Sequence, residues 1–346
     1  MKVIFIAYTD FRIVNSGSSV RPYKIYTAFK EKGYKVLLIN GEVKERRSKF
    51  LEYKRRNMFR DVDYCYIEPS TYPTHPLDYL MLAYIKKLNI PIGIFYRDMY
   101  YKFPEFFKKS GFKKYELLFR YYLDWRLFKR ISKVIFFPSN TMAGYFNFHN
   151  KVALPPAGEV KKLRSIKLNN NVIYVGGISE RYGTPVLLEA LKIVNNCYKR
   201  IGLNLVCREY EDKIFAKYKN EAWLNIINAS GTQLEKIYAE SDIAIIPRKR
   251  NEYFDFSVPV KLFEYMSYNL PIISTKCFET ATFIKQNNIG IVVNDDAKSI
   301  AQAIIDVYEN PYRIRELKDN IQNCLVSENL WVHRIDKIEQ CLYGVR

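Results

Sequence analysis

With 346 residues, of which 48% are hydrophobic and 26% charged, the chain has the length and composition of a soluble protein of two ordinary domains. It has no apolar run of about 18 residues that could span a membrane, its first apolar run is too short for a signal peptide, and its six cysteines lack zinc-site spacing, so we expect a cytoplasmic protein with reduced thiols. The net charge is +19, of which residues 1–150 carry +15, and such a surface attracts nucleic acid, anionic lipid or a phosphorylated acceptor.

Short apolar runs alternate with longer segments of helical periodicity, which is the pattern of parallel α/β units. We expect strands at 2–8, 34–39, 63–67, 91–96, 133–137, 172–175, 203–207, 224–228, 242–246, 271–274 and 289–293. Helices are clearest at 21–32, 184–198 and 297–309. The pattern restarts near residue 172, after a Pro/Gly/Lys stretch at 154–165 that we interpret as a linker. The expected fold is α/β, with a doubly wound parallel sheet in each of two domains, 1–155 and 166–327.

The residues that follow each strand are the first candidates for a site, because loops and helix N-termini gather beyond the carboxyl ends of parallel strands. The polar and glycine residues at these positions are, in chain order, Glu68, Ser70, Arg97, Asp98, Arg208, Ser230, Gly231 and Arg248.

Two glycine-containing loops follow the first strands of the two halves. In N-S-G-S-S at 15–19, small residues such as Gly17 would let backbone N–H groups approach an anion, although an ordinary strand-to-helix turn explains the segment equally well. V-G-G-I-S-E-R-Y-G at 175–183 is more specific, since Gly176 and Gly177 permit close approach of a ligand and Arg181 could meet a phosphate. It lacks the G-x-G-x-x-G spacing of a dinucleotide oxidoreductase.

The most informative segment is residues 246–275. A strand should end at Pro247, followed by a flexible loop of about ten residues and a helix with Ser257 as its N-cap and Pro259 in its first turn.

Helical spacing places Lys261, Glu264 and Tyr265 on one face of that helix, opposite three apolar residues. Free N–H groups, an ammonium and a carboxylate one turn later could hold a diphosphate and a ribose diol. The alternative is an ordinary surface ion pair worth a few tenths of a kcal/mol.

No metal site is expected. The D-V-D sequence at 61–63 precedes a strand, which is the wrong end of a parallel sheet for a ligand, so we interpret Asp61 and Asp63 as solvated turn carboxylates. The three histidines lack metal-ligand spacing.

These motifs resemble those of the retaining glycosyltransferases of family 4, the glycosyl transferases group 1, which have the GT-B fold. The likeness is carried by GSSVRPYKIYTAFKEKGYKVLLI, VGGISERYGTPVLLEAL, ASGTQLEKIYAESDIAIIPR, PVKLFEYMSYNLPIIST with its P-x-K-x-x-E pattern, and IGIVVNDDAKSIAQAI. The resemblance implies two Rossmann-like domains facing a central cleft, with a final helix at 328–346 that returns to the first domain.

By this resemblance, Lys261 binds the diphosphate, Glu264 the ribose hydroxyls, and the backbone from Ser257 to Val258 the leaving group. The remaining expected donor-binding residues are Gly17, Gly176, Gly177, Arg208, Ser230, Gly231 and Arg248. Lys261, Arg181 and Asp98 are the expected catalytic residues. Asp98 would orient or deprotonate an acceptor, with Glu68, Ser70 and Arg97 beside it. Phe256 stands where many members have a glutamate associated with the donor sugar, which leaves the identity of that sugar open.

The expected function is transfer of a hexosyl group from a nucleotide-diphosphate sugar, UDP-sugar rather than GDP-sugar, to a lipid-linked or other glycan acceptor in surface-polysaccharide synthesis. The resemblance implies retention of configuration, and no metal or cofactor. Two alternatives remain: a nucleotide-sugar epimerase of the same fold, and a non-catalytic partner subunit. A nucleic-acid partner is disfavoured, because the basic residues are spread over several loops and helices instead of forming one stripe.

A membrane partner is indicated by residues 99–116, which interleave aromatic residues with lysines. The aromatic residues are Tyr100, Tyr101, Phe103, Phe106, Phe107 and Phe112, and the lysines are Lys102, Lys108, Lys109, Lys113 and Lys114. Residues 44–60 add further positive charge. We expect peripheral attachment to an anionic surface, the inner face of the plasma membrane. The alternative is a helix with an aromatic core and solvated lysines.

Overall fold

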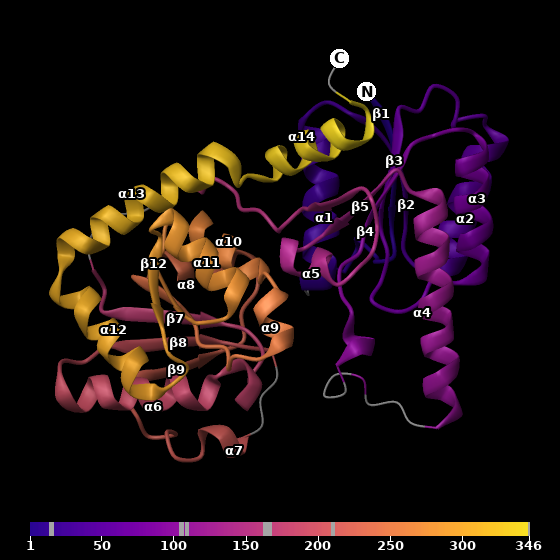
Figure 1. The fold of residues 1–346 in the computed structure, drawn as a ribbon. Helices are drawn as coiled ribbons and strands as arrows, with labels where there is room; N and C mark the ends of the chain where they lie inside the picture. Colours follow the sequence, from indigo (N-terminus) through magenta and orange to yellow (C-terminus); the bar gives the residue numbers. More distant parts are fainter. Residues whose placement is uncertain (14–16, 104–106, 108–110, 162–167, 209–211, 345–346) are drawn as a thin grey trace. The chain divides into compact units, whose positions relative to one another are not determined.

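The computed structural model describes residues 1–13, 17–103, 107, 111–161, 168–208 and 212–344. The chain divides into two compact units: unit 1 consists of Met1–Pro155 with Trp331–Arg346, and unit 2 of Pro156–Leu330. In each unit helices flank a central sheet (Figure 1). Within the described ranges, no helix combines the length and the apolar character needed to cross a membrane.

Unit 1 contains a six-stranded sheet in the order β2-β1-β3-β4-β5-β6, with every pair parallel. The strands are β1 (Lys2–Ala7), β2 (Lys35–Asn40), β3 (Tyr64–Glu68), β4 (Ile92–Phe95), β5 (Val134–Phe137) and β6 (Lys151–Ala153). The helices are α1 (Gly17–Glu31), α2 (Val43–Arg55), α3 (Pro76–Lys87), α4 (Phe112–Ile131), α5 (Asn140–Gly144) and α14 (Trp331–Leu342). The strand order reverses at β1, which pairs with β2 on one side and β3 on the other.

Unit 2 contains a second six-stranded parallel sheet, in the order β12-β11-β10-β7-β8-β9. The strands are β7 (Asn171–Val175), β8 (Gly202–Val206), β9 (Leu224–Ile227), β10 (Ile243–Ile246), β11 (Ile272–Thr275) and β12 (Gly290–Val293). The helices are α6 (Thr184–Cys197), α7 (Asp212–Phe215), α8 (Gly231–Ala239), α9 (Glu252–Phe256), α10 (Val260–Ser267), α11 (Phe278–Asn287), α12 (Ala297–Glu309) and α13 (Pro311–Glu328). The strand order reverses between β7 and β10.

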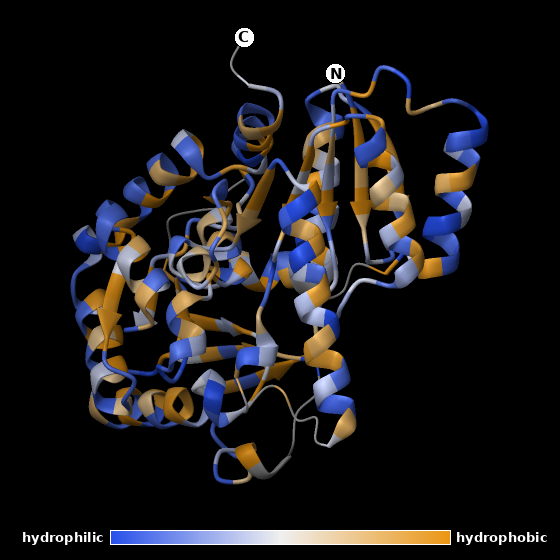
Figure 2. Ribbon diagram, turned by 45° about the vertical axis from the view of Figure 1, so that its right-hand side comes forward, coloured by the Kyte–Doolittle hydropathy of each residue, from blue (hydrophilic) through white to orange (hydrophobic). Residues whose placement is uncertain are grey.

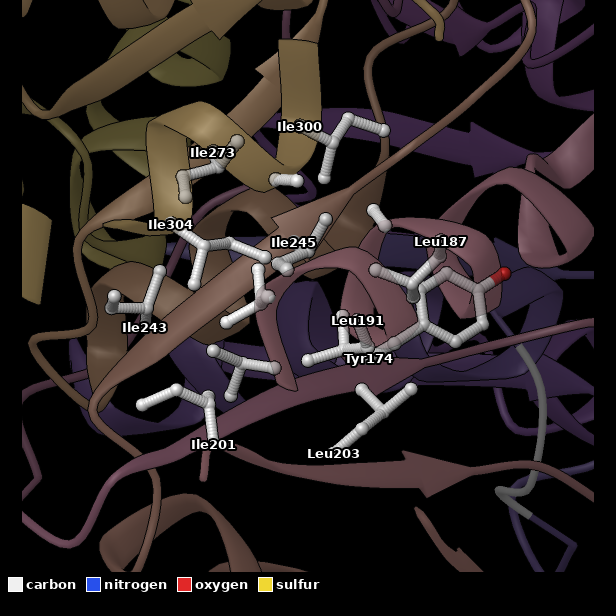
Figure 3. Close-up of a cluster of buried hydrophobic side chains, with 14 of the residues drawn as sticks. Tyr174, Leu187, Leu191, Ile201, Leu203, Ile243, Ile245, Ile273, Ile300 and Ile304 are labelled. Atoms are coloured by element: carbon white, nitrogen blue, oxygen red, sulfur yellow. The ribbon is translucent and has the colours of Figure 1, made fainter. Parts of the chain in front are cut away.

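Alternating side chains of the unit 2 strands build a hydrophobic core on each face of the sheet. Val172 and Tyr174 contribute to one core and Ile173 to the other, and β10 alternates in the same way. Figure 3 shows the first core, where leucines of α6 and isoleucines of α12 meet the strands. The strands of both sheets are largely hydrophobic, while hydrophilic residues lie mostly on the helices and loops (Figure 2). This burial on both faces explains why the strands were recognisable as continuous apolar runs.

The predicted α/β class with two doubly wound parallel sheets is confirmed. Each of the eleven expected strands is present with both ends within one residue of prediction. The prediction missed β6, because the Lys-Val-Ala sequence of this edge strand is not an apolar run. Helix α1 begins at Gly17 and not near Arg21, so Gly17 lies in the first helical turn and not in a loop. Residues 15 and 16 of that predicted loop lie outside the described residues.

The C-terminal helix α14 belongs to unit 1 and packs on α1. It begins at Trp331, three residues later than predicted, because α13 ends at Glu328. Lys32 forms an ion pair with Asp336, and the Tyr34 hydroxyl donates a hydrogen bond to Glu339. Leu342 lies against Gly93 of β4, so closely that a Cβ at position 93 would be 2.8 Å from its Cδ1. These contacts anchor the end of the chain to the unit formed by its beginning.

Candidate active site

The candidate site of unit 2 lies beyond the carboxyl ends of β7 and β10, the neighbouring strands between which the strand order reverses. Such a point opens a crevice in a doubly wound sheet, because the helices that follow the two strands leave in opposite directions. The loop after β7 spans Gly176–Gly183, and the segment after β10 runs from Pro247 to Pro259. The two segments contact each other, since the backbone N–H of Lys249 donates to the carbonyl of Arg181 at 3.2 Å.

Gly183 allows this contact. Its φ of 74° is a left-handed conformation, and a Cβ at this position would lie 1.5 Å from the carbonyl oxygen of Pro247. Any other residue would separate the two loops or strain the backbone.

Lys261 lies in the first turn of α10 and places its amine directly beside the loop after β7. A Cβ at Gly176 would be only 2.0 Å from the Lys261 Nζ and 2.8 Å from the Tyr174 hydroxyl. The same amine lies 5.4 Å from the centre of the Tyr174 ring. Glycine at position 176 therefore makes room for the ammonium group at the end of β7.

The environment of Lys261 is short of negative charge. Burial lowers the pKa of Lys261 to about 7, and the positive charge of Arg248 adds to this effect. Glu264 acts in the opposite direction, and Arg208 contributes a further lowering. The positive charges of Arg248 and Arg208 thus act on Lys261 against the negative charge of Glu264 alone, so the arrangement favours an anionic ligand that would restore the full charge of Lys261.

Glu264 lies one turn after Lys261 on α10 and is partly buried. The hydroxyl of Tyr238, on α8, donates a hydrogen bond to its Oε2 at 3.3 Å. Burial raises the pKa of Tyr238, and the Glu264 carboxylate raises it further, so this hydroxyl remains a donor. The contact orients a carboxylate that can accept hydrogen bonds from a diol.

Arg248 is held by the segment between β10 and α10. Its Nη1 donates to the hydroxyl of Ser257 at 3.0 Å, and its guanidinium lies 4.7 Å from the centre of the Phe254 ring. The predicted role of Ser257 as the N-cap of the following helix is wrong: Pro259 occupies that position, and Ser257 ends α9. The expected flexible loop contains this short helix, which is capped by Asn251 accepting from the Phe254 N–H at 2.8 Å. Val258 follows Ser257 and is partly buried.

Tyr265 does not share the accessible face of Lys261 and Glu264, as the helical spacing predicted. It is fully buried, and its hydroxyl accepts a hydrogen bond from the backbone N–H of Val175 at 3.0 Å. The N–H at the end of β7 needs an acceptor, and Tyr265 supplies it from α10. This side chain therefore fixes the helix to the strand whose loop receives the Lys261 amine.

The other predicted donor-side residues lie around this cluster and are more exposed. Gly177 is exposed beside the Tyr182 ring, and Arg181 lies in a 3₁₀ turn at Glu180–Tyr182 with its guanidinium 4.8 Å from the same ring. Arg208 is exposed after β8, and Ser230 and Gly231 begin α8 after β9. The structure brings Lys261, Gly176, Arg248, Ser257 and Glu264 together at one place. Gly17 belongs to unit 1.

In unit 1, Glu68 ends β3 in a fully buried position. It forms ion pairs with Arg21 and, at 3.3 Å, with Arg97, and it accepts a hydrogen bond from the Tyr66 hydroxyl at 3.0 Å. Sequence reasoning missed Arg21, whose guanidinium also lies 3.5 Å from the centre of the Phe95 ring. The geometry makes Glu68 an internal anchor that holds Arg97 beyond the carboxyl end of β4.

A small pocket lies beside Arg97. Its lining includes all three remaining acceptor-side candidates together with tyrosines and a second carboxylate: Ser70, Arg97, Asp98, Tyr72, Tyr96, Tyr121 and Asp124. Asp98 Oδ1 accepts from the Met99 N–H at 2.8 Å. Sequence reasoning missed Asp124, whose carboxylate accepts from the Thr74 N–H at 2.8 Å and whose pKa is raised by burial. Its spacing from the buried Tyr121 and Phe128, three and four residues away on α4, is the signal that could have revealed it.

Asp63 accepts a hydrogen bond from the backbone N–H of Lys2 at 2.8 Å and directly precedes β3, at the opposite end of that strand from Glu68. Over the described ranges, no cluster of three or more His, Cys, Asp or Glu side chains could hold a metal ion.

Comparison with known sequences gives two results. Residues 169–310 match the family model described as "Glycosyl transferases group 1". No curated protein sequence matches the chain.

Solved structures are similar over essentially the whole chain. A sucrose-phosphate synthase from Thermosynechococcus elongatus is 13% identical, with a TM-score of 0.69 and coverage of 98% of each chain. The Anabaena protein HepE, solved in complex with UDP and glucose, is 13% identical with a TM-score of 0.67 and complete coverage of both chains. WaaG, a glycosyltransferase involved in lipopolysaccharide biosynthesis, is 14% identical with a TM-score of 0.62, covering 99% of this chain and 100% of that one. At these identities the similarity establishes the fold, which is GT-B.

Proposed function

We propose that this chain, which has the GT-B fold and whose residues 169–310 match the glycosyl transferases group 1 model, transfers a sugar from a nucleotide-diphosphate sugar to a glycan acceptor. One observation carries the proposal: the Lys261 amine, the glycine loop after β7, Arg248 and Glu264 converge where the strand order of unit 2 reverses. A nucleoside diphosphate offers this cluster both the anion and the ribose diol that its residues suit.

The proposed chemistry relies on charge stabilisation. As the bond between sugar and diphosphate breaks, negative charge builds on the leaving oxygens. The Lys261 ammonium, the Arg248 guanidinium and the first N–H groups of α10 lower the energy of that charge, while Glu264 accepts hydrogen bonds from the ribose. The acceptor hydroxyl forms the new bond to the sugar and loses its proton, with Asp98 as the proposed orienting or basic residue. We propose retention of configuration on the basis of the family resemblance.

The proposed donor is a UDP-sugar carrying a hexosyl group. The Anabaena protein of similar fold was solved with UDP, with UDP and glucose, and with UDP-glucose, which supports this choice. We propose no metal or further cofactor, because the cationic side chains beside Gly176 can neutralise a diphosphate directly.

We further propose that unit 1 binds the acceptor through the pocket lined by Arg97 and Asp98. Its tyrosines and carboxylates suit a sugar ring with its hydroxyl groups. The proposed acceptor is a lipid-linked glycan of surface-polysaccharide synthesis, and the proposed location is the cytoplasmic face of the plasma membrane. The excess of positive charge on residues 1–150 supports a partner with anionic groups.

The test is thermal unfolding with a panel of UDP-, GDP- and ADP-sugars and the corresponding free nucleotides. UDP and at least one UDP-sugar should raise the melting temperature in proportion to the logarithm of their concentration. Absence of stabilisation by every nucleotide would contradict the proposal. Incubating the stabilising sugar nucleotide alone gives a second readout, because rapid epimerisation or complete hydrolysis without acceptor would identify an epimerase instead.

A further inference from the structure

Helix α4 carries two apolar faces, of which only one is used by the fold. The buried face consists of Tyr121, Phe128 and Ile131 together with Asp124. On the opposite side, the exposed fractions are 83% for Phe112, 71% for Tyr115, 60% for Phe119, 52% for Tyr122 and 39% for Leu123. At 100° per residue these five side chains form one continuous stripe, which we call the α4 stripe. Single exposed apolar residues are common on protein surfaces, but a periodic row of aromatic residues marks an interaction surface.

Within unit 1, no segment of the described ranges covers the α4 stripe, as the exposure of its side chains shows. Figure 1 shows that the N-terminal half of α4 extends past the ends of α2 and α3 in the same unit. A stripe in this position can meet a broad flat surface without obstruction from those neighbouring helices.

The charge around the α4 stripe indicates which kind of partner it binds: a second copy of the chain, a nucleic acid or a lipid bilayer. On the side of the stripe the helix carries exposed Arg126, Lys129 and Arg130, against one exposed acidic residue, Glu116. The exposed Lys113 and Lys114 lie on the other side of the helix. Arg126 is tied to the stripe itself, since its Nη1 donates to the Tyr122 hydroxyl at 3.0 Å. Two copies of so basic a helix repel each other, and a nucleic acid would leave Phe112, Phe119 and Leu123 in water. An anionic bilayer suits both the aromatic side chains and the basic side chains of α4. Phenyl rings enter the headgroup region, tyrosine hydroxyls stay at its polar edge, and basic residues meet lipid phosphates.

We propose that α4 docks the protein on an anionic lipid bilayer, lying in the interface plane with the α4 stripe directed into the membrane. This refines the surface predicted at 99–116. Tyr101 stacks on Tyr121 at 4.4 Å between ring centres, and Phe103 is 6% exposed, so these aromatic residues belong to the interior of unit 1. Phe106, Lys108 and Lys109 lie outside the described residues. The proposal agrees with a lipid-linked acceptor and so rests in that respect on the proposed function, but docking itself requires no transferase activity.

The test is sedimentation of the full chain with vesicles of phosphatidylcholine alone or mixed with phosphatidylglycerol, without any sugar nucleotide. The wild type should bind the mixed vesicles at least tenfold more tightly than the neutral ones. The double variant F112S/F119S should lose at least tenfold in affinity at low salt. The double variant R126E/R130E should lose binding to a similar extent, because both side chains lie on the stripe side of α4, each basic residue near an anionic surface contributes about 1 kcal/mol, and the substitution reverses its sign.

Matched controls come from unit 2. F278S/Y312S removes two aromatic residues of comparable exposure, and K285E/K298E reverses two exposed charges. Both should bind mixed vesicles like the wild type, and all four variants should keep the wild-type melting temperature and nucleotide affinity.

Equal binding by wild type and F112S/F119S would overturn the proposal, as would equal losses in the control variants. A wild-type dimer that F112S/F119S converts to a monomer, without vesicle binding, would assign the stripe to a second copy of the chain. Failure of docking with intact sugar transfer contradicts only this inference, whereas docking without nucleotide binding contradicts only the proposed function.

Discussion

At the scale of single residues, Lys261 is the lysine of the candidate donor site whose pKa is lowered by its surroundings. Burial lowers its pKa to about 7, from 10.5 in the unfolded chain. Below pH 7 the native state must keep a buried ammonium, which reduces the stability of the fold. As pH rises from about 7 to 10.5, the native state releases this proton while the unfolded chain retains it, so the penalty is progressively relieved. The charged form of Lys261 therefore lowers the stability of the empty protein, and a bound anionic ligand would remove this loss.

Proton uptake should consequently accompany binding of a nucleoside diphosphate. At pH 8.5 the amine is mostly neutral in the empty site, and the diphosphate raises its pKa, so we expect an uptake approaching one proton. Affinity should fall as pH rises above about 7, by up to about tenfold per unit. Calorimetry in two buffers of different ionisation enthalpy measures the uptake, and K261M should abolish it. Identical binding enthalpies in both buffers for the wild type would contradict this account of the site.

Glu264 yields a separate prediction. E264Q should weaken binding of free UDP by about tenfold, because a neutral amide loses the charge-assisted hydrogen bonds that a carboxylate accepts from a diol. The exposed Glu309 at the end of α12 provides the control, and E309Q should bind UDP like the wild type. If E264Q binds UDP with wild-type affinity, Glu264 has no part in recognising the ribose.

Sequence reasoning located the cluster but not its internal arrangement. A lysine and a glutamate three residues apart after a strand indicated the anion site. The buried position of Tyr265 depends on a hydrogen bond to Val175, ninety residues earlier in the chain, which no local pattern encodes. The Ser257 cap failed for a related reason, since a short helix stabilised by buried Tyr253, Phe254 and Phe256 forms where polar residues had indicated a loop.

At the scale of elements, the strands were predicted well because parallel sheets are buried on both faces and their strands are continuous apolar runs. Helix ends were harder to predict. Helix α1 starts at Gly17 instead of near Arg21, and α14 starts at Trp331 instead of residue 328. The ion-pair network of Glu68, Arg21 and Arg97 was also not predicted, because its members come from α1, β3 and the loop after β4, which are far apart in sequence.

The contact between the loops after β7 and β10 is testable through two glycines of similar backbone conformation. Gly183 has φ of 74° and would direct a Cβ into the Pro247 carbonyl, whereas Gly231 has φ of 55° with no atom within 4 Å of its Cβ position. G183A should lower the free energy of unfolding by about 3 kcal/mol or more, since strain adds to the clash. G231A should lose only about 1 kcal/mol.

Urea denaturation measures both values, and UDP binding should weaken in G183A, where the two loops are forced apart. Similar losses of stability in the two variants would mean that left-handed strain alone, and not the packing of the loops, determines the effect.

At the scale of the whole molecule, the excess positive charge and the candidate donor site lie in different parts of the chain. Residues 1–150 carry +15 of the net +19, while the cationic cluster of the candidate donor site lies in the nearly neutral remainder. The excess charge is therefore a property of unit 1 and its proposed partner, and the donor site relies on a few positioned residues. This division was visible in the sequence, but the stripe on α4 was not, because exposure cannot be read from helical periodicity alone.

Metal dependence is a further whole-molecule prediction. Sugar transfer should continue at an unchanged rate with excess EDTA, because Lys261 and Arg248 supply the positive charge that a divalent cation would otherwise provide. Rates measured before and after chelation, with magnesium or manganese added back, check this directly. Activity lost on chelation and restored by either ion would require a metal ligand set outside the cluster described here.

The central claim is that Lys261 neutralises the leaving diphosphate of a sugar donor, and the most direct measurement is transfer of labelled sugar from the stabilising sugar nucleotide to a membrane extract. K261A should lower the transfer rate at least ~100-fold, the scale of losing one preorganised charge contact to a developing oxyanion. K285A, which removes an exposed lysine from the last turn of α11, should transfer at the wild-type rate. A K261A protein with normal melting and normal transfer would contradict the account.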